Sequence, residues 1–312
     1  MRDACQATHG GARGTPKGAR KVATIELRPT VTGKPRELQG FLNRVLYHPA
    51  ARRLATALAR TPVTPNMVSL FGALMVVTTG ILYARVGTPA AIAGGFLLHL
   101  LWHVVDGADG DLARMTGRAS PIGELVDGLC DYGGHIILYV LLATTLDDAI
   151  GIGAWVLAVA AGLSRVMQSV FAESSRRSYQ WWAYGVPWLQ HNRAVPRGPG
   201  RAFSALYLLL SGLVTGATDR VNALVAGAEI DPHERHRIAR LARESGPAIL
   251  GIPAALGANP RTVMLGVSML AGSSIWFFLV EITVLNVLLV FGIARQRAQC
   301  RRLIDLIARG RG

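Results

Sequence analysis

Cysteine is scarce in this chain, and charged residues are few. The 312 residues include three cysteines, Cys5, Cys130 and Cys300, and 17% of the residues are charged, against 51% that are hydrophobic. Three scattered cysteines exclude a disulfide framework and a thiolate metal site, so we expect free thiols. The low charge and the high apolar content exclude an ordinary soluble domain. They indicate a small all-α membrane protein with several spanning helices.

An apolar export signal is lacking as well. The chain begins MRDACQATHGGARGTPKGARK, which has no apolar core, so we expect the first spanning helix itself to direct insertion. Residues 1–35 are rich in glycine, arginine, lysine and threonine, and this composition predicts a disordered basic tail.

Acidic residues are outnumbered by basic ones. The chain has 33 Lys and Arg against 19 Asp and Glu, a formal net charge of +14. The basic residues lie in the tails and in one loop between apolar runs, a placement typical of cytoplasmic segments that face anionic lipid headgroups. We therefore expect membrane lipids as partners, and no nucleic acid.

Apolar runs predict the membrane spans. Four of them lie at about residues 67–84, 90–105, 121–145 and 150–172. Residues 246–295 are apolar again and must hold two more passes if both termini lie on one side, with a boundary near residues 271–274. Glu281 in the last pass should face the bundle. One membrane domain then covers residues 63–297, and residues 298–312 form a basic tail.

Two segments mix apolar and basic residues. Residues 36–62 carry leucines at helical intervals with interleaved arginines, which predicts an amphipathic helix in the membrane interface, broken near Pro49. A partner-binding helix is the alternative. Residues 173–245 predict a basic, aromatic cytoplasmic loop, which includes Trp181 and Trp182 as interfacial anchors, and then a helical insertion. Its run FSALYLLLSGLVTGA is too short to be assigned as a span.

The most informative stretch, residues 106–131, joins the second and third spans and reads DGADGDLARMTGRASPIGELVDGLCD. If the second helix continues into it, Asp106 and Asp109 are three residues apart and share a face. Asp127 and Asp131 are four apart and share a face of the next helix. Two helices that meet at this level would bring four carboxylates into one pocket.

Four like charges need a counter-charge, so such a pocket either takes up protons or binds metal. Ligation by oxygen alone favours Mg²⁺ or Mn²⁺ over Zn²⁺. Arg114 and Arg118 supply positive charge suited to phosphate oxygens, and neighbouring glycines let a ligand approach the backbone. These residues predict a metal-assisted site for a diphosphate. A solvated acidic helix end is the alternative.

The same stretch resembles a family signature. It has the order D-x-x-D-G-x-x-A-R, eight residues, then G-x-x-x-D-x-x-x-D, filled by Asp106, Asp109, Gly110, Ala113, Arg114, Gly123, Asp127 and Asp131. This pattern resembles the signature of the CDP-alcohol phosphatidyltransferases. The resemblance implies a six-helix membrane enzyme of phospholipid biosynthesis. Such an enzyme cleaves the diphosphate of a CDP-linked substrate, joins the phosphoryl group to an alcohol and releases CMP.

The resemblance also implies residue roles. Two divalent ions, Mg²⁺ or Mn²⁺, would be held by Asp106, Asp109 and Asp127. Asp131 would ligate metal as well, and would take the proton of the acceptor hydroxyl. The cytidine nucleotide would be received by Gly110, Ala113 and Arg114. A homodimer is implied by the same resemblance.

Other polar residues lie inside the predicted spans. His99 and His103 are four apart and could ligate metal, although packing in the bundle is more common. His135 continues the four-residue step from Asp131 and could orient a carboxylate, relay a proton or pack. Arg165 is too deep to face lipid, so it either points into the pocket and binds phosphate or pairs with an acid.

The sequence leaves the acceptor alcohol open. SPIGELVDGLCD looks like the choline and ethanolamine phosphotransferase branch, in which the headgroup carries CDP and diacylglycerol accepts. RTPVTPN looks like bacterial members that use CDP-diacylglycerol and a polyol or polyol phosphate. A site on the cytoplasmic side of the membrane, the inner membrane in a bacterium, would be reached by both substrates. The rival class is a divalent-cation transporter or channel, which would need polar residues to continue towards the outer face.

Overall fold

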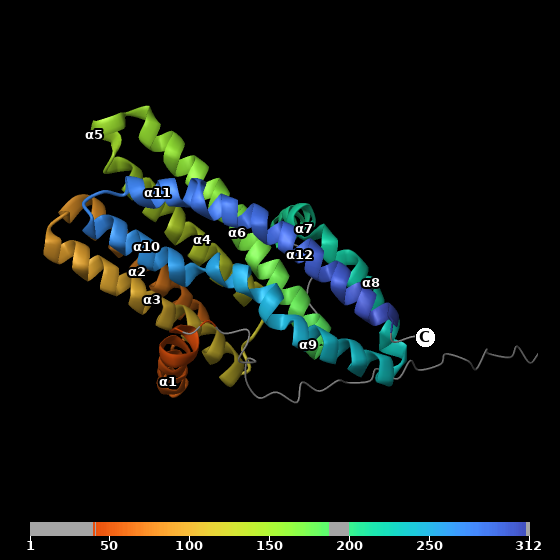
Figure 1. The fold of residues 1–312 in the computed structure, drawn as a ribbon. Coiled ribbons are helices and arrows are strands. Elements are labelled where there is room, and N and C mark those ends of the chain that lie inside the picture. The colour runs from red at the N-terminus through yellow and green to blue at the C-terminus, as the bar shows by residue number, and fades with distance from the viewer. Residues whose placement is uncertain (1–39, 41, 187–199, 310–312) are drawn as a thin grey trace, which may run out of the picture.

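The computed structural model describes residues 40, 42–186 and 200–309, and these form a bundle of helices (Figure 1), which confirms the predicted all-α class. The main helices are α1 (His48–Leu58), α2 (Pro65–Ile81), α3 (Pro89–Met115), α4 (Pro121–Thr144), α5 (Asp147–Ile150), α6 (Ile152–Tyr184), α7 (Gly200–Thr215), α8 (Asp219–Gly227), α9 (Pro232–Ala255), α10 (Ala258–Leu270), α11 (Ile275–Ile282) and α12 (Val284–Arg309). The predicted tail at residues 1–35 and the predicted loop at 187–199 lie outside the described residues.

Four helices begin with a capping residue followed by proline. The caps of α2, α3, α4 and α9 are Thr64, Thr88, Ser120 and Asp231. Each accepts a hydrogen bond from a backbone N–H in the first turn; Ser120 Oγ, for example, accepts from Gly123 N at 3.0 Å. Proline suits the first helical position because no N–H is needed there and its φ is already helical. The starts of these helices are therefore set locally by the sequence.

Five described helices are long and apolar enough to cross a membrane, which identifies an integral membrane protein. They are Pro65–Arg85, Pro89–Met115, Ile122–Thr144, Ile152–Tyr184 and Ile275–Arg309. A break between helices is found near residues 271–274, where the boundary was predicted, because α10 ends at Leu270 and α11 begins at Ile275. The fifth predicted pass, however, is divided at Leu256 and Gly257 between α9 and α10. A count of six spans stays a prediction.

The chain before the bundle is helical, but it is not broken at Pro49. One turn of π-helix, Asn43–Tyr47, leads into α1, and Pro49 lies in the first turn of α1. Proline needs no donor in a first turn, so the helix continues past it. Helix α1 lies across one end of the bundle (Figure 1) and packs tightly on α3: a Cβ added at Gly107 would lie 3.1 Å from the Cβ of Ala51. Its placement in the membrane interface stays a prediction.

Helix α6 corrects the prediction of a loop from residue 173. It runs unbroken from Ile152 to Tyr184, which is about 50 Å at 1.5 Å per residue. Tyr179 and Trp182 are fully buried, and Trp181 nearly so, in a second core shared with α8, α9 and α12. Because α9 covers them, these aromatic residues are core residues and not interfacial anchors.

Arginines of α9 cap the ends of two long helices. Arg235 donates to the carbonyl oxygens of Trp181 at 2.7 Å and Trp182 at 2.8 Å, at the end of α6. Arg237 donates to the carbonyl oxygen of Ile307 at 2.7 Å, near the end of α12. The last carbonyls of a helix lack helical partners and carry negative partial charge, so cations stabilise them. Helix α9, part of the predicted insertion, thus links the end of α6 to the end of α12.

Candidate functional site

The acidic stretch folds as two helices joined by a tight turn. Helix α3 continues through Asp106 and Asp109, as predicted, and ends at Met115. Gly117 adopts a φ of 66° in the turn that follows, a conformation that favours glycine. Helix α4 then carries Asp127 and Asp131 back along the bundle, and both helices pack on α2.

Three of the four predicted carboxylates converge. Asp106, Asp127 and Asp131 each offer one oxygen, and these oxygens lie within 4.8 Å of one another. All three residues are half-buried. Asp106 lies within hydrogen-bonding reach of Asp131. Carboxyl groups this close need a proton or a cation between them.

The fourth carboxylate, that of Asp109, is held in place from a different helix. Asp109 is 5% exposed; its Oδ2 accepts from Ser69 Oγ of α2 at 2.7 Å, and its Oδ1 accepts from Gly110 N at 2.5 Å. It also lies within hydrogen-bonding reach of Asp127. Sequence reasoning missed Ser69, because nothing in its spacing connects it to residues 40 positions later.

The donor set fits a hard divalent ion. The three converging ligand atoms are all carboxylate oxygens, the ligands that Mg²⁺ and Mn²⁺ prefer. The three histidines make other contacts. His103 Nε2 is 3.0 Å from Thr262 Oγ1, and the ring of His99 stacks on that of His103. His135 Nδ1 donates to the backbone oxygen of Asp131 at 2.7 Å. These contacts favour packing over ligation for His99 and His103, and they leave the role of His135 a prediction.

The predicted nucleotide-binding residues line the last turns of α3 and the turn after it. Arg114 folds back over Gly110, where an added Cβ would lie 3.3 Å from the guanidinium group. Arg114 also pairs with Asp111 at 2.5 Å, and its side chain is 59% exposed. A salt bridge this exposed is weak, so a phosphate could compete for it. Ala113 is half-buried, and Arg118 is exposed in the turn.

Arg165 of α6 lies between the carboxylates and a deeper polar network. Its guanidinium carbon is 5.8 Å from the ring centre of Tyr139, and both Asp131 and Glu281 lie within its electrostatic reach. Among the described residues no carboxylate forms a salt bridge with it, because Glu281 pairs with Arg261 at 2.9 Å. Of the two alternatives for Arg165, pairing with an acid is therefore not found in the described chain, and phosphate binding in the pocket stays a prediction.

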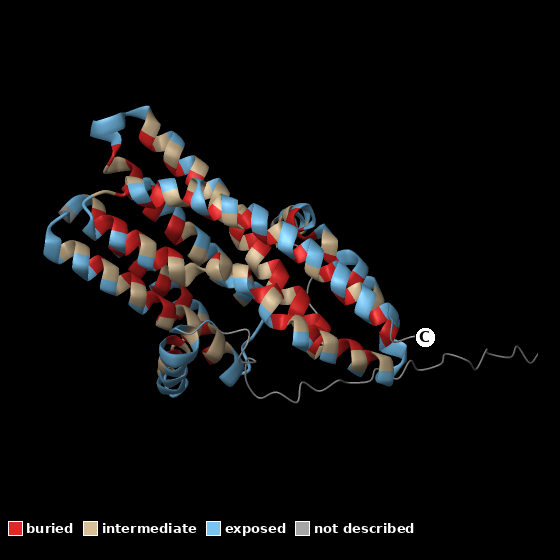
Figure 2. Ribbon diagram, in the orientation of Figure 1, coloured by how far each residue is buried: buried red, intermediate tan, exposed pale blue. Residues whose placement is uncertain are grey.

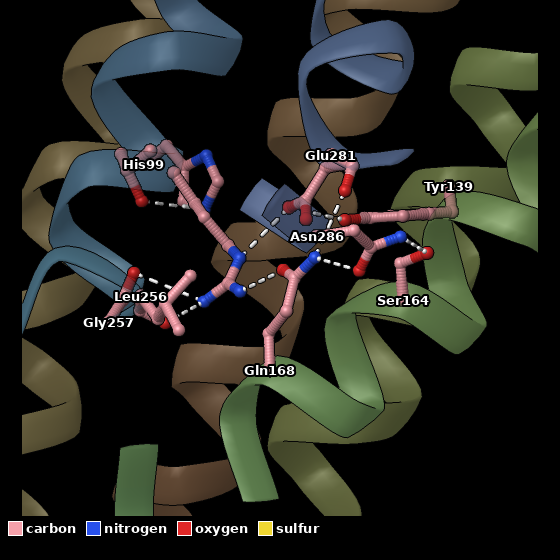
Figure 3. Close-up of polar contacts among 10 residues, drawn as sticks. His99, Tyr139, Ser164, Gln168, Leu256, Gly257, Glu281 and Asn286 are labelled. Atoms are coloured by element: carbon pink, nitrogen blue, oxygen red, sulfur yellow. Dashed lines mark hydrogen bonds and ion pairs between the residues drawn. The ribbon is translucent and has the colours of Figure 1, made fainter. Parts of the chain in front are cut away.

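The deeper network links α4, α6, α10, α11 and α12 (Figure 3). Glu281 is fully buried, as predicted for a residue facing the bundle, and accepts from Tyr139 Oη at 3.2 Å and from Arg261 Nε. Gln168 accepts from Arg261 Nη2 at 2.6 Å and donates to Asn286 Oδ1 at 2.9 Å. The pairing of Arg261 with Glu281 has no spacing signal in the sequence.

Arg261 also explains how the break between α9 and α10 is tolerated. Pro260 has no N–H to donate to the carbonyl of Leu256, four residues earlier. Arg261 Nη1 donates to that carbonyl instead, and to the carbonyl of Gly257 at 3.2 Å. The buried guanidinium thus satisfies backbone groups that water would satisfy elsewhere.

The described chain is thus a helical membrane bundle with a cluster of carboxylates near an arginine at one level of its spanning helices. Residues 62–225, more than half of the chain, match the family model described as CDP-alcohol phosphatidyltransferase. The chain belongs to the CDP-alcohol phosphatidyltransferase family, and the resemblance found in the motif is confirmed at the level of the family.

The chain is also similar to a curated protein of Thermococcus kodakarensis, the "Bifunctional IPC transferase and DIPP synthase". The two are 28% identical over 212 residues, which are 67% of this chain and 45% of that protein. The chain spans less than half the length of this relative. The family match ends within α8, so α9 to α12 lie beyond it.

Proposed function

We propose that this protein transfers a substituted phosphoryl group from a CDP-linked alcohol or CDP-diacylglycerol to an acceptor alcohol, with release of CMP, in phospholipid synthesis. The observation that carries the proposal is the convergence of Asp106, Asp127 and Asp131 within 4.8 Å, next to the helix turn that bears Arg114. Membership of the family supports it.

The carboxylates would hold two divalent ions, Mg²⁺ or Mn²⁺. The ligands would be Asp106, Asp109, Asp127 and Asp131. When bound, such ions neutralise charge on a diphosphate and on the departing CMP. The hydrogen bond from Ser69 fixes the orientation of the Asp109 carboxylate, in the way that outer partners orient metal ligands.

In the transfer, Asp131 takes the proton of the acceptor hydroxyl. The acceptor oxygen forms a bond to phosphorus while the bond from phosphorus to the CMP oxygen breaks, so CMP leaves with the electron pair. Gly110 and Ala113 present little bulk to the nucleotide, and Arg114 and Arg118 offer charge to its phosphates. Asp131 is half-buried on α4, with its backbone oxygen bound by His135, which limits its movement.

Arg165 would bind a phosphate oxygen from the interior side of the site. It reaches Asp131 electrostatically and has no carboxylate partner at salt-bridge distance among the described residues. An interior cation needs an anion nearby. A substrate phosphate would supply it, from the diphosphate or from a phosphorylated acceptor.

The site would lie at the cytoplasmic face of the membrane. It is next to the turn at residues 116–120 between two spanning helices, and basic residues flank it, the arrangement typical of cytoplasmic segments. This level lets a lipid enter from the bilayer and a polar molecule from water. Glu281, the deeper acid, is neutralised by Arg261, which argues against an ion pathway through the bundle.

The test is release of CMP by the purified protein with Mg²⁺ or Mn²⁺. CDP-choline, CDP-ethanolamine and CDP-diacylglycerol are each offered with diacylglycerol, a polyol or a polyol phosphate. We expect one pairing to be turned over, and Asp131→Asn to abolish turnover while binding of the CDP substrate survives. Asp219→Asn, at the exposed start of α8, is the matched control. Turnover at the normal rate by Asp131→Asn would show that the base is wrongly assigned.

A further inference from the structure

Helix α7 buries hydroxyl groups together with apolar residues, and its exposed face is apolar. Its exposed residues are leucines, with exposed fractions of 54%, 64% and 66% at Leu206, Leu209 and Leu213. Two of its buried residues are hydroxylic, Ser211 at 0% and Thr215 at 2% exposed, beside the apolar Val214 at 5%. A helix that covers the core of a protein in water exposes polar and charged residues instead. The surroundings of α7 are therefore apolar.

The inward face of α7 is fastened to α6 by hydroxyl groups. Ser211 Oγ donates to Ser174 Oγ at 2.8 Å, and Ser174 Oγ is 3.0 Å from Tyr207 Oη. Thr215 Oγ1 donates to the backbone oxygen of Ser211 at 2.8 Å. Hydrogen bonds between small polar side chains hold helices together where burial of apolar surface offers little, as it does within lipid.

Charged residues lie behind α7. Glu173 of α6 accepts from Arg176 Nε at 2.8 Å and from Arg177 Nε at 2.6 Å. Tyr207 of α7 lies within electrostatic reach of Glu173 and Arg177. Helix α7 covers this triplet only in part, because the side chains of Arg176, Glu173 and Arg177 remain 28%, 37% and 43% exposed.

The partners of α7 belong to the apolar parts of two spanning helices. Leu210 and Tyr207 pack in a core cluster with Val170 and Phe171 of α6 and with Leu285 and Leu289 of α12. Both helices are candidate membrane spans, and their outward residues at neighbouring levels are apolar and exposed, such as Val287 at 71%. Figure 2 shows these exposed faces along α6 and α12, with α7 packed against the bundle. The leucines of α7 extend the surface that the spans present.

We propose that α7 is embedded in the lipid, with Leu206, Leu209 and Leu213 in contact with acyl chains and its inner face beside the Glu173 cluster. Its 16 residues cover about 24 Å at 1.5 Å per residue, which is less than the roughly 30 Å of the hydrocarbon core. Helix α7 therefore enters the membrane without crossing it. The buried hydroxyl groups and exposed leucines of α7 support this placement, which the length and hydropathy of the helix alone do not indicate.

Spin labelling of the full chain in phosphatidylcholine vesicles tests the proposal. Nitroxides are attached to single cysteines at Leu206, Leu209 or Leu213 in a cysteine-free background, and relaxation by O₂, which concentrates in lipid, is compared with relaxation by a water-soluble nickel chelate. The control label replaces Ile230, which is 91% exposed at the tip after α8. We expect O₂ to be severalfold more effective than nickel on α7, and nickel to be more effective at Ile230.

Two results would overturn the proposal. Nickel access on α7 equal to that at Ile230 would place the helix in water. Exclusion of both reagents together with dipolar broadening between labels would place a second copy of the chain, and not lipid, on this face. The measurement is independent of turnover, so the transferase proposal can fail while this one holds.

Charge substitutions in the protein with its native cysteines provide a second test of the lipid contact, which does not depend on the labelled variants. Leu209→Asp should lower the Tm in vesicles by several degrees, because a carboxylate would enter hydrocarbon. Ile230→Asp should leave the Tm unchanged. Equal Tm values for both variants and the wild type would contradict a lipid contact at Leu209.

Discussion

Two polar clusters in this bundle differ in how completely they are paired. Around Arg261 and Glu281, the side chains of two amides, a tyrosine and a serine match donors to acceptors across several helices (Figure 3). At the ends of α3 and α4, carboxylates converge on each other, and the nearest motif arginine, Arg114, pairs instead with Asp111. The first cluster pairs its charges within the protein, although Glu281 Oε2 has no hydrogen-bond partner among the described residues. The second gathers like charges, which a proton or a cation would have to offset.

This difference indicates that one cluster contributes mainly to stability and the other mainly to function. A buried ion pair with its hydrogen bonds made is costly to break, because the remaining charge has no water. A cluster of like charges stores repulsion, and ligand binding relieves it. Substitutions in the first cluster should therefore change folding, and substitutions in the second cluster should change chemistry.

The largest effect is expected from Asp131→Asn in the second cluster. Loss of the base should lower turnover by about a hundredfold to ten-thousandfold. The Tm should stay unchanged or rise, since one of several like charges is removed. The rate of CMP release checks the expected loss of turnover, and thermal unfolding of the same preparation checks the expected Tm. An inactive variant with a much lower Tm would show that Asp131 stabilises the fold, and would contradict the assignment of its cluster to chemistry alone.

Glu281→Ala should have the largest effect on stability. It leaves the Arg261 guanidinium, 3% exposed, without its carboxylate, at a cost of about 3–5 kcal/mol. Unfolding in detergent followed by circular dichroism measures the loss. The double variant Arg261→Met with Glu281→Leu should recover part of it, because no unpaired charge remains but the carbonyls of Leu256 and Gly257 lose their donor. A single variant as stable as the wild type would show that the network is not structural.

Arg165→Ala should raise KM by about tenfold to a hundredfold, the range of a lost hydrogen bond to a charged group. The fold should survive, because no salt bridge of Arg165 exists among the described residues to be broken. Arg165→Lys should recover part of the affinity, since the charge is kept and the fork of donors is lost. A drop in Tm with unchanged KM would indicate a structural role.

The smallest of these effects is expected from Ser69→Ala. The variant loses one hydrogen bond to Asp109, which is worth about 1 kcal/mol. Because the bond orients a proposed ligand, the affinity for Mn²⁺ should fall by about tenfold. Titration of Mn²⁺ by its paramagnetic resonance signal measures this, with Ser245→Ala as control, whose hydroxyl donates to a helix carbonyl of α9 in the part of the chain that the structure describes. Equal affinities would remove Ser69 from the site.

The parts of the fold that follow from local chemistry could be predicted from the sequence. Caps such as Ser120 set helix starts, and the three- and four-residue steps of the aspartates put them on shared faces. The convergence of Asp106 with Asp127 and Asp131 then needed only that the chain turn back at Gly117.

The rest depended on contacts between distant segments. Trp181 and Trp182 have the composition of an interfacial anchor, and only the cover of α9 makes them core residues. Arg261 and Glu281 are 20 residues apart in different helices, so no helical spacing connects them. Ser69 reaches Asp109 because α2 packs on α3. In each case the partner is set by tertiary packing, which periodicity does not encode.

The central claim is that the convergent aspartates bind divalent ions that hold a diphosphate. Titration of Mn²⁺ into the purified protein, followed by its paramagnetic resonance signal, tests it most directly, with and without a CDP substrate. The account predicts saturable binding by the wild type that tightens with the CDP substrate and is lost in Asp127→Asn. Equal Mn²⁺ binding by Asp127→Asn and the wild type, or no saturable binding by either, would contradict it.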